Sequence, residues 1–375
     1  MTNATIIDPL ALAQTLIRAE SVTPARGAAF DVLEAALLPL GFMIERFVEG
    51  DAPEGPVENL LAVRAGIGRH LAFAGHLDVV PPGDGWSGSP WSGAVHGDLL
   101  YGRGAVDMKG AIAAFAAAAG ATPGTLSLII TGDEEGPATY GTPRLIERMA
   151  ELGVKPDLCL VGEPTSVARL GDTVKIGRRG SVNIWIDVPG KQGHVAYPHL
   201  ANNPIPRLVA ALSAIQAIVL DHGNAWFQPS NVEITDLNVG NPAANVVPAK
   251  ASARISIRFN DEQRGDALVE RIAAVVQSHA PGAKVTAKVS GEAFLTPPGA
   301  LSQLVADAIH DVTGIEPDLS TTGGTSDARF LSRLCPTVEF GLVNATMHQC
   351  DEAVAVDDLR ALAAIYGAII ARACG

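Results

Sequence analysis

The sequence has few cysteines, no long apolar run and fewer basic than acidic residues. Its four cysteines among 375 residues have no Cys-x-x-Cys spacing, so we expect reduced thiols and no disulfide scaffold. The longest apolar stretch, around 111–119, is rich in alanine and much shorter than the roughly 20 residues that span a bilayer. The first eight residues also lack the basic and apolar regions of a secretory signal. These absences predict a cytoplasmic protein.

The charge balance restricts the kinds of partner. With 27 basic and 40 acidic residues, the formal net charge is −13. Nucleic acids and anionic membrane surfaces need a basic surface on the protein, so neither is expected as a partner. An anionic substrate would have to be bound by individual arginine or lysine side chains.

The order of expected elements predicts an α/β protein with an inserted domain. Strands and helices alternate up to about residue 174, which favours a mostly parallel sheet covered by helices. The order then changes to β-α-β-β-α-β, which is typical of a ferredoxin-like domain. We therefore predict one domain formed by residues 1–179 and 295–375, with residues 180–294 inserted. The elements of the insertion are strand 181–188, helix 204–220, strands 231–239 and 246–259, helix 262–279 and strand 284–290.

Helices are also expected on both sides of this insertion. In the helix over 262–279, Leu268, Ile272 and either Val275 or Val276 share one apolar face, which we expect to cover the smaller sheet. The other expected helices are 9–18, 28–40, 108–119, 300–312, 326–334 and 356–373.

Histidine or acidic residues follow four short apolar runs of the larger domain that we expect to be strands, at 71–75, 126–131, 157–161 and 337–340. Asp107 instead ends a glycine-rich turn, just before the expected helix over 108–119. Parallel strands of an α/β sheet present such residues at one edge, beyond their carboxyl ends. Imidazole and carboxylate groups are ligands for divalent metal ions. The sequence therefore predicts one metal centre, made by His76, Asp107, Glu135, Glu163 and His348.

The number of predicted ligands indicates two ions. A catalytic zinc ion takes three protein ligands and keeps one position open, so five ligands exceed the needs of one ion. If Asp107 bridges two ions, His76 and Glu163 complete one set, and Glu135 and His348 the other. A water or hydroxide shared by two such ions is acidified, and a carbonyl beside them is polarised, which is hydrolytic chemistry. Because structural zinc sites favour closed, cysteine-rich shells, this carboxylate-rich set is typical of a catalytic site.

Asp78 and the adjacent pair Glu134 and Glu135 have alternative interpretations. Asp78 lies two residues beyond His76 and is expected either to accept a hydrogen bond from the imidazole or to cap amides of a turn. Glu134 and Glu135 are adjacent, so one can bind metal while the other transfers protons. Spacing alone does not distinguish their roles.

These residues lie in motifs that resemble the signatures of the di-zinc aminoacylase and carboxypeptidase family, which includes acetylornithine deacetylase. The resemblance implies two zinc ions per subunit, with cobalt able to substitute. It makes Glu134 the general acid/base and Glu135 the ligand, and it implies a cis peptide between Asp107 and Met108. The motifs are His-Leu-Asp at 76–78, Gly-Arg-Gly-Ala-Val-Asp-Met-Lys-Gly at 102–110, Thr-Gly-Asp-Glu-Glu-Gly at 131–136 and Gly-Glu-Pro-Thr at 162–165.

Further motifs carry a resemblance to a subset of this family. They imply hydrolysis of the amide bond of N-succinyl-LL-2,6-diaminopimelate to succinate and LL-2,6-diaminopimelate, in lysine and peptidoglycan precursor synthesis. The alternatives are hydrolysis of another N-acyl amino acid, such as acetylornithine, or a non-catalytic homologue that only binds metal or ligand. These motifs lie at 175–181, 321–330 and 344–349.

The same resemblance implies residues that contact the small dicarboxylate substrate. Arginine pairs with carboxylates in bidentate fashion, and amides of the loop at 321–326 could bind an anion. Taken alone, His194 is a loop histidine with no role. The resemblance makes it an oxyanion-stabilising donor supplied by the partner subunit of a homodimer formed through the inserted domain. The expected substrate-binding residues are Arg178, Asn245, Arg258, Gly324 and Thr325.

Overall fold

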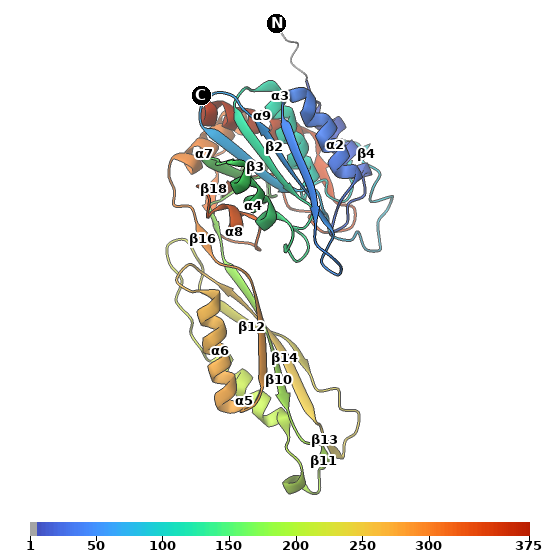
Figure 1. Ribbon diagram of the computed structural model, residues 1–375, viewed down its shortest axis with the longest axis vertical. Helices are drawn as coiled ribbons and strands as arrows, with labels where there is room; N and C mark the ends of the chain where they lie inside the picture. Colours follow the sequence, from blue (N-terminus) through green and yellow to red (C-terminus); the bar gives the residue numbers. More distant parts are fainter. Residues whose placement is uncertain (1–5) are drawn as a thin grey trace. The chain divides into compact units, whose positions relative to one another are not determined.

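The computed structural model describes residues 6–375 and divides the chain into two compact units (Figure 1). The first unit runs to Ile176 and continues over Thr296–Ser320 and Ser326–Gly375, and the second comprises Gly177–Leu295 and Thr321–Thr325. The segment 321–325 thus belongs to the second unit, although the sequence-based boundaries assign it to the first. Residues 1–5, on which the prediction about a signal sequence partly rests, lie outside the described residues.

The first unit is built on an eight-stranded mixed sheet. The four strands β6, β3, β7 and β18 are neighbours and run parallel, which confirms the predicted mostly parallel α/β architecture. In spatial order the strands are β1 (Met43–Glu49), β2 (Val57–Arg64), β6 (Thr125–Thr131), β3 (His70–His76), β7 (Leu158–Val161), β18 (Thr337–Glu339), β8 (Thr173–Lys175) and β17 (Asp318–Ser320).

Helices cover both faces of this sheet, as Figure 1 shows. Helices α3 and α9 pack against each other and both contact β3, and the alanine-rich sequence of α3 allows close approach because the side chains are small. Helices α4 and α8 lie on the opposite face. The helices are α1 (Pro9–Arg18), α2 (Ala28–Leu37), the short 3₁₀ helix η1 (Leu38–Leu40), α3 (Lys109–Ala121), α4 (Thr142–Leu152), α7 (Ala300–Thr313), α8 (Ala328–Leu331) and α9 (Val356–Cys374).

A small three-stranded sheet joins distant parts of the first unit. It contains β4 (Ala94–His96), β5 (Leu99–Tyr101) and β19 (Ala353–Ala355). Because β19 pairs antiparallel with β5, the segment after His348 lies beside the segment that leads to Asp107.

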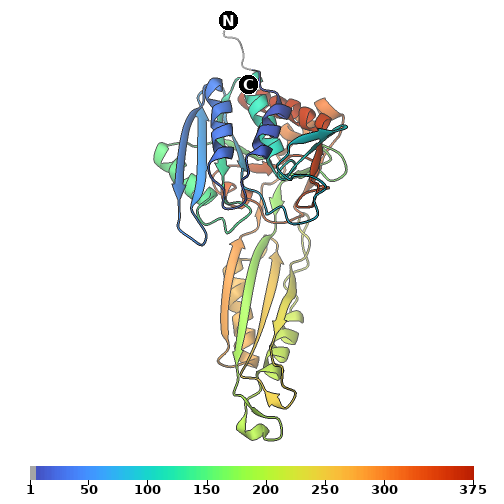
Figure 2. The ribbon, with the colours of Figure 1, turned by 90° about the vertical axis from the view of Figure 1, so that its right-hand side faces the viewer.

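The second unit has the predicted ferredoxin-like topology. Its antiparallel strands lie in the order β12-β14-β10-β15, and both helices pack on one face of the sheet (Figure 2). The main elements are β10 (Gly180–Pro189), α5 (Pro204–Gln216), β12 (Asn231–Asn238), β14 (Lys250–Phe259), α6 (Gly265–His279) and β15 (Lys284–Gly291). Smaller elements are β9 (Gly177–Arg178), β11 (Gly193–His194), η2 (Pro198–Leu200), β13 (Val246–Val247) and β16 (Phe294–Leu295).

Several element predictions were wrong in detail; for example, the helix expected over 204–220 ends at Gln216. The strand expected over 246–259 is divided into β13 and β14, with Pro248 between them, because proline cannot donate to a strand ladder. The helix expected over 326–334 is shortened at both ends to α8, and just before its start the side chains of Ser326 and Asp327 are hydrogen-bonded to Glu339 and Thr142, respectively.

Helix α6 shows which valine completes its apolar face. Leu268, Ile272 and Val276 are buried at intervals of four residues, whereas Val275 is only partly buried. Among residues 6–375, no helix is both long and apolar enough to cross a membrane.

Candidate metal centre

The predicted ligands emerge where neighbouring parallel strands end. His76 is the last residue of β3 and pairs in register with Thr131, the last residue of β6. Glu135 follows β6, and Glu163 follows β7 on the other side of β3. The edge predicted from the apolar runs therefore gathers side chains from three adjacent strands.

Asp107 lies between two histidines. Its Oδ1 atom is 3.2 Å from Nε2 of His76, and its Oδ2 atom is 3.1 Å from Nε2 of His348. Asp107 immediately precedes Met108, the N-cap of α3, and the peptide between them is cis, as the resemblance implies. Its two oxygen atoms thus face two different sets of ligands.

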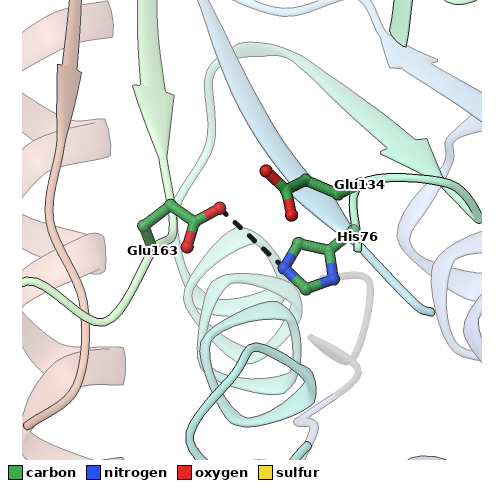
Figure 3. A group of neighbouring side chains, drawn as sticks. All are labelled: His76, Glu134 and Glu163. Carbon is green, nitrogen blue, oxygen red and sulfur yellow. Dashed lines mark ion pairs between the residues drawn. The ribbon is translucent and has the colours of Figure 1, made fainter. Parts of the chain in front are cut away.

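Each histidine also lies near a glutamate. Nε2 of His76 is 3.8 Å from Oε1 of Glu163, and Figure 3 shows the Glu134 carboxylate beside the same imidazole. Nε2 of His348 is 2.8 Å from Oε1 of Glu135. All five predicted ligands are therefore brought together within the first unit.

These distances suit divalent cations. Around a tetrahedral ion with bonds of about 2.0–2.1 Å, neighbouring ligand atoms lie roughly 3.3 Å apart. The pairs above span 2.8–3.8 Å, and imidazole and carboxylate donors match ions such as zinc. The residues present fit a metal centre.

Proximity alone leaves the role of Glu134 open. Among the described residues, two groups of three donors lie within 4.8 Å of one another. One contains His76, Asp107 and Glu135, and the other contains His76, Glu134 and Glu163. Glu134 is therefore close enough to bind an ion as well as to transfer a proton.

The Asp78 carboxylate caps backbone amides of a turn and does not accept a hydrogen bond from the His76 imidazole. Nδ1 of His76 lies 2.9 Å from the backbone carbonyl of Asp78, but 3.7 Å from its carboxylate. Since a carbonyl only accepts, Nδ1 carries the proton, and the Nε2 lone pair of a neutral ring is directed at the ligand cluster. The Asp78 carboxylate instead accepts hydrogen bonds from the amides of Glu134 at 3.2 Å and Glu135 at 3.0 Å.

The clustered charges displace the pKa values of these groups. Burial alone would lower the pKa of His76, but Asp107, Asp78 and Glu163 raise it well above its usual range. Hydrogen bonds to Asp107 and Glu135 raise the pKa of His348 to about 10. Without a bound metal, protonated imidazoles supply the positive charge that bound cations would supply.

The carboxyl groups respond differently according to their partners. Burial alone would raise the pKa of Asp107, but hydrogen bonds from His348 and His76 hold it well below its usual range. Burial raises the pKa of Asp78 to about 6. Burial, followed by the charge of Glu163, raises the pKa of Glu134 well above its usual range. A raised carboxyl pKa favours the protonated form, which is the form that a general acid needs.

Arg329 is a neighbour of Glu134 that was not predicted from the sequence. Its buried guanidinium lies 3.9 Å from Oε1 of Glu134 and 3.8 Å from Oδ1 of Asp327. The available signal was its place in the motif at 321–330. Glu352, which accepts a hydrogen bond from the amide of Asp107, was also missed.

The predicted substrate-binding residues and His194 all lie in the second unit. Gly323 has a φ of +110°, and a Cβ added there would lie 2.5 Å from Nη1 of Arg178, so this loop lies directly against the arginine. The same loop carries Gly324 and Thr325. Arg258 donates to the hydroxyl of Ser181.

His194 lies at the opposite end of this unit's main sheet from Arg258. Its strand, β11, pairs with β13, and Asn245 lies beside it because the amide of Val195 donates to the Asn245 carbonyl at 3.1 Å. Arg258 is the ninth residue of β14 and Lys250, the first residue, lies at the His194 end, so about 25–30 Å of strand separates the two ends at about 3.3 Å per residue. His194 and Asn245 are therefore brought together, but not with Arg258.

Comparison with known proteins gives relatives along nearly the whole chain. Residues 72–372 match the model of peptidase family M20/M25/M40. A protein of Sphingopyxis alaskensis named succinyl-diaminopimelate desuccinylase is 67% identical over 98% of both chains. A protein of the same name from Rhizorhabdus wittichii is 65% identical over 97% of this chain and 98% of its own.

Solved structures share the fold at low sequence identity. A tripeptidase from Staphylococcus aureus superposes with a TM-score of 0.80 at 20% identity, covering 98% of this chain and 99% of its own. The YxeP protein of Bacillus subtilis, described as a dinuclear metal-binding peptidase of the M20 family, has a TM-score of 0.70 at 18% identity, covering 97% and 96%. With the family match spanning most of its length, the chain belongs to the peptidase family M20/M25/M40.

Proposed function

We propose that this protein hydrolyses the amide bond of N-succinyl-LL-2,6-diaminopimelate, releasing succinate and LL-2,6-diaminopimelate. The observation that carries the proposal is the 67% identity, over nearly the full length of both chains, to a relative named for this activity. The clustered imidazole and carboxylate donors support hydrolysis as the reaction class. This activity serves lysine and peptidoglycan precursor synthesis and agrees with the cytoplasmic location predicted from the sequence.

We infer that two zinc ions occupy the centre, with cobalt able to replace them. His76, Asp107 and Glu163 would hold one ion, while Asp107, Glu135 and His348 would hold the other. The support is that the two oxygens of Asp107 face different histidines. When bound, such ions would polarise the scissile carbonyl and acidify a water molecule.

Glu134 transfers the protons in this proposal. Its buried carboxyl group lies beside His76, and its raised pKa suits a group that alternately accepts and donates a proton. It takes the proton of the attacking water and passes it to the departing amine. Asp78 holds the Glu134 amide in place, which limits the positions that the carboxylate can reach.

The substrate carboxylates bind to groups of the second unit. Arg178 and Arg258 supply positive charge, which an acidic protein of net charge −13 must provide locally. Gly324 and Thr325 lie on the loop against Arg178, where backbone amides can donate to an anion. Asn245 lies beside His194, so its amide side chain would reach the substrate together with that histidine, from the partner subunit.

His194 acts on the active site of a partner subunit in a homodimer formed through the second unit. Within one chain, roughly 25–30 Å of sheet separates it from Arg258, so the two cannot contact one substrate molecule there. Its imidazole would donate to the oxyanion that develops at the scissile carbonyl.

The proposed substrate predicts that the enzyme prefers the succinylated diamino acid to acetylornithine. With zinc restored after chelation, kcat/KM for N-succinyl-LL-2,6-diaminopimelate should exceed that for acetylornithine by about 100-fold or more, because only the former places a carboxylate at both ends for the arginines. Steady-state kinetics with each substrate measures this ratio. A preference for acetylornithine would establish the alternative hydrolase, and binding without hydrolysis of either would establish a non-catalytic homologue.

Subunit exchange tests the role of His194. His194→Ala and Glu134→Gln proteins should each be inactive alone, whereas an equal mixture that exchanges subunits should regain about a quarter of the wild-type activity. After exchange, half of the dimers contain one chain of each variant. In each of these dimers, one of the two active sites has both an intact Glu134 and an intact His194. Two portions of His194→Ala protein mixed together are the control. An inactive mixture in which mixed dimers are detected would place His194 in its own chain's site.

Metal binding should compete with protons. Imidazole must be neutral to bind a metal, and the pKa of about 10 keeps His348 protonated at neutral pH in the metal-free protein. The apparent zinc affinity should therefore rise between about pH 6 and 8, by roughly tenfold per pH unit for each proton released. Calorimetric titration of metal-free protein in buffers of different ionisation enthalpy measures the release. Heats that do not depend on the buffer would contradict it, and a His348→Gln variant should release about one proton fewer.

A further inference from the structure

A buried glutamate contacts the backbone of the proposed bridging ligand. The side chain of Glu352 is fully buried, and its Oε1 atom accepts hydrogen bonds from the amides of Val106 at 2.8 Å and Asp107 at 3.1 Å. Its Oε2 atom accepts from Nη1 of Arg103 at 2.6 Å. One carboxylate thus binds the loop that ends in Asp107 at three points.

The backbone of the same segment fixes the start of that loop. The carbonyl of Glu352 accepts from the amide of Gly102 at 2.9 Å, and Ala353 in β19 pairs with Tyr101 in β5. The pairing of β5 with β19 thus ends where the loop from Gly102 to Asp107 begins. From there the side chain of Glu352 contacts the loop as far as Asp107. This loop contains glycines at 102 and 104, both with positive φ, so its own conformational preferences restrain it weakly.

The Arg103–Glu352 ion pair is expensive to bury. Arg103 is 2% exposed, lies over the ring of Trp86 at 5.2 Å and donates to the carbonyl of Pro82 at 3.3 Å. Removing both charges from water costs about as much as their attraction returns, so such a pair is weak evidence for a role in stability. A geometric role explains better why a charged acceptor is held against the Asp107 amide.

The place of Glu352 in the chain links two proposed ligands. It lies four residues after His348, which faces the second oxygen of Asp107 at 3.1 Å. A displacement of the Asp107 backbone would move the carboxylate away from both histidines. The segment 348–352 therefore supplies one ligand and holds the backbone of another.

We propose that Glu352 is a positioning residue that sets the Asp107 carboxylate between His76 and His348, so that one carboxylate can bind two ions. This inference rests on the proposed dinuclear centre. It concerns metal binding and not the substrate, so it can be tested without any assay of hydrolysis.

A matched pair of variants separates positioning from stability. Glu352→Gln removes the charge opposite Arg103. Its side-chain NH₂ group, which donates and does not accept, would face either the guanidinium or the backbone amides. Glu58→Gln is the control, because Glu58 is also buried, pairs with Arg46 and accepts from the amide of Gly27 at 2.6 Å. Calorimetric titration of metal-free protein with zinc gives the affinity and stoichiometry, and thermal unfolding of the same samples gives the stability.

Glu352→Gln should weaken zinc binding by about 10- to 100-fold, the usual effect of losing a group that orients a ligand. Glu58→Gln should leave zinc affinity unchanged, even if it lowers the melting temperature as much. If Glu352→Gln does not fold, Glu352→Asp keeps the charge but shortens the reach, and the same loss of affinity is expected. Unchanged affinity and stoichiometry in a folded Glu352 variant would overturn the proposal. If the variants change zinc affinity as expected but the unaltered protein does not hydrolyse the succinylated substrate, only the proposed function is refuted.

Discussion

The placement of Asp107 between two histidines is the constraint on which the rest of the centre depends. Its oxygen atoms lie 3.2 Å from His76 and 3.1 Å from His348, so one carboxylate serves both halves of the cluster. Glu134, Glu135 and Glu163 crowd around the same imidazoles, and such a concentration of negative charge is stable only with cations nearby. In the metal-free protein the raised pKa values of the histidines meet this need with protons.

The fold gathers these groups by two separate means. Adjacent parallel strands bring His76, Glu135 and Glu163 to one edge of the sheet, because such strands end side by side. Asp107 and His348 lie in two loops that are some 240 residues apart in the sequence. The pairing of β5 with β19 holds these two loops together. Since the second unit is inserted between these segments, the centre forms only when the chain returns to the first unit.

The sequence predicted those parts that depend on a local pattern. Short apolar runs located the strands, and the histidine or acidic residue after each run located a candidate ligand, which the structure places in the cluster. The β-α-β-β-α-β order was enough to predict the ferredoxin-like unit, and the apolar spacing of Leu268 and Ile272 located the buried face of α6. Periodicity allowed Val275 or Val276 on that face, and only packing against the sheet selected Val276.

Contacts that depend on backbone positions could not be predicted in this way. Nothing in the sequence shows that the ring of His76 reaches the carbonyl of Asp78, leaving the carboxylate for the amides of Glu134 and Glu135. Arg329 and Glu352 each act on a residue far away in the chain, so spacing gave no indication of their partners.

In the proposed mechanism two adjacent glutamates have different roles, since Glu135 binds metal and Glu134 transfers protons. The most direct measurement is the zinc content and turnover of Glu134→Gln, with Glu135→Gln as its matched control. Glu134→Gln should retain two zinc ions per chain and lose about 10²- to 10⁴-fold in kcat, whereas Glu135→Gln should lose zinc as well. Loss of an ion from Glu134→Gln, or turnover near that of the unaltered enzyme, would show that the two glutamates do not have these separate roles.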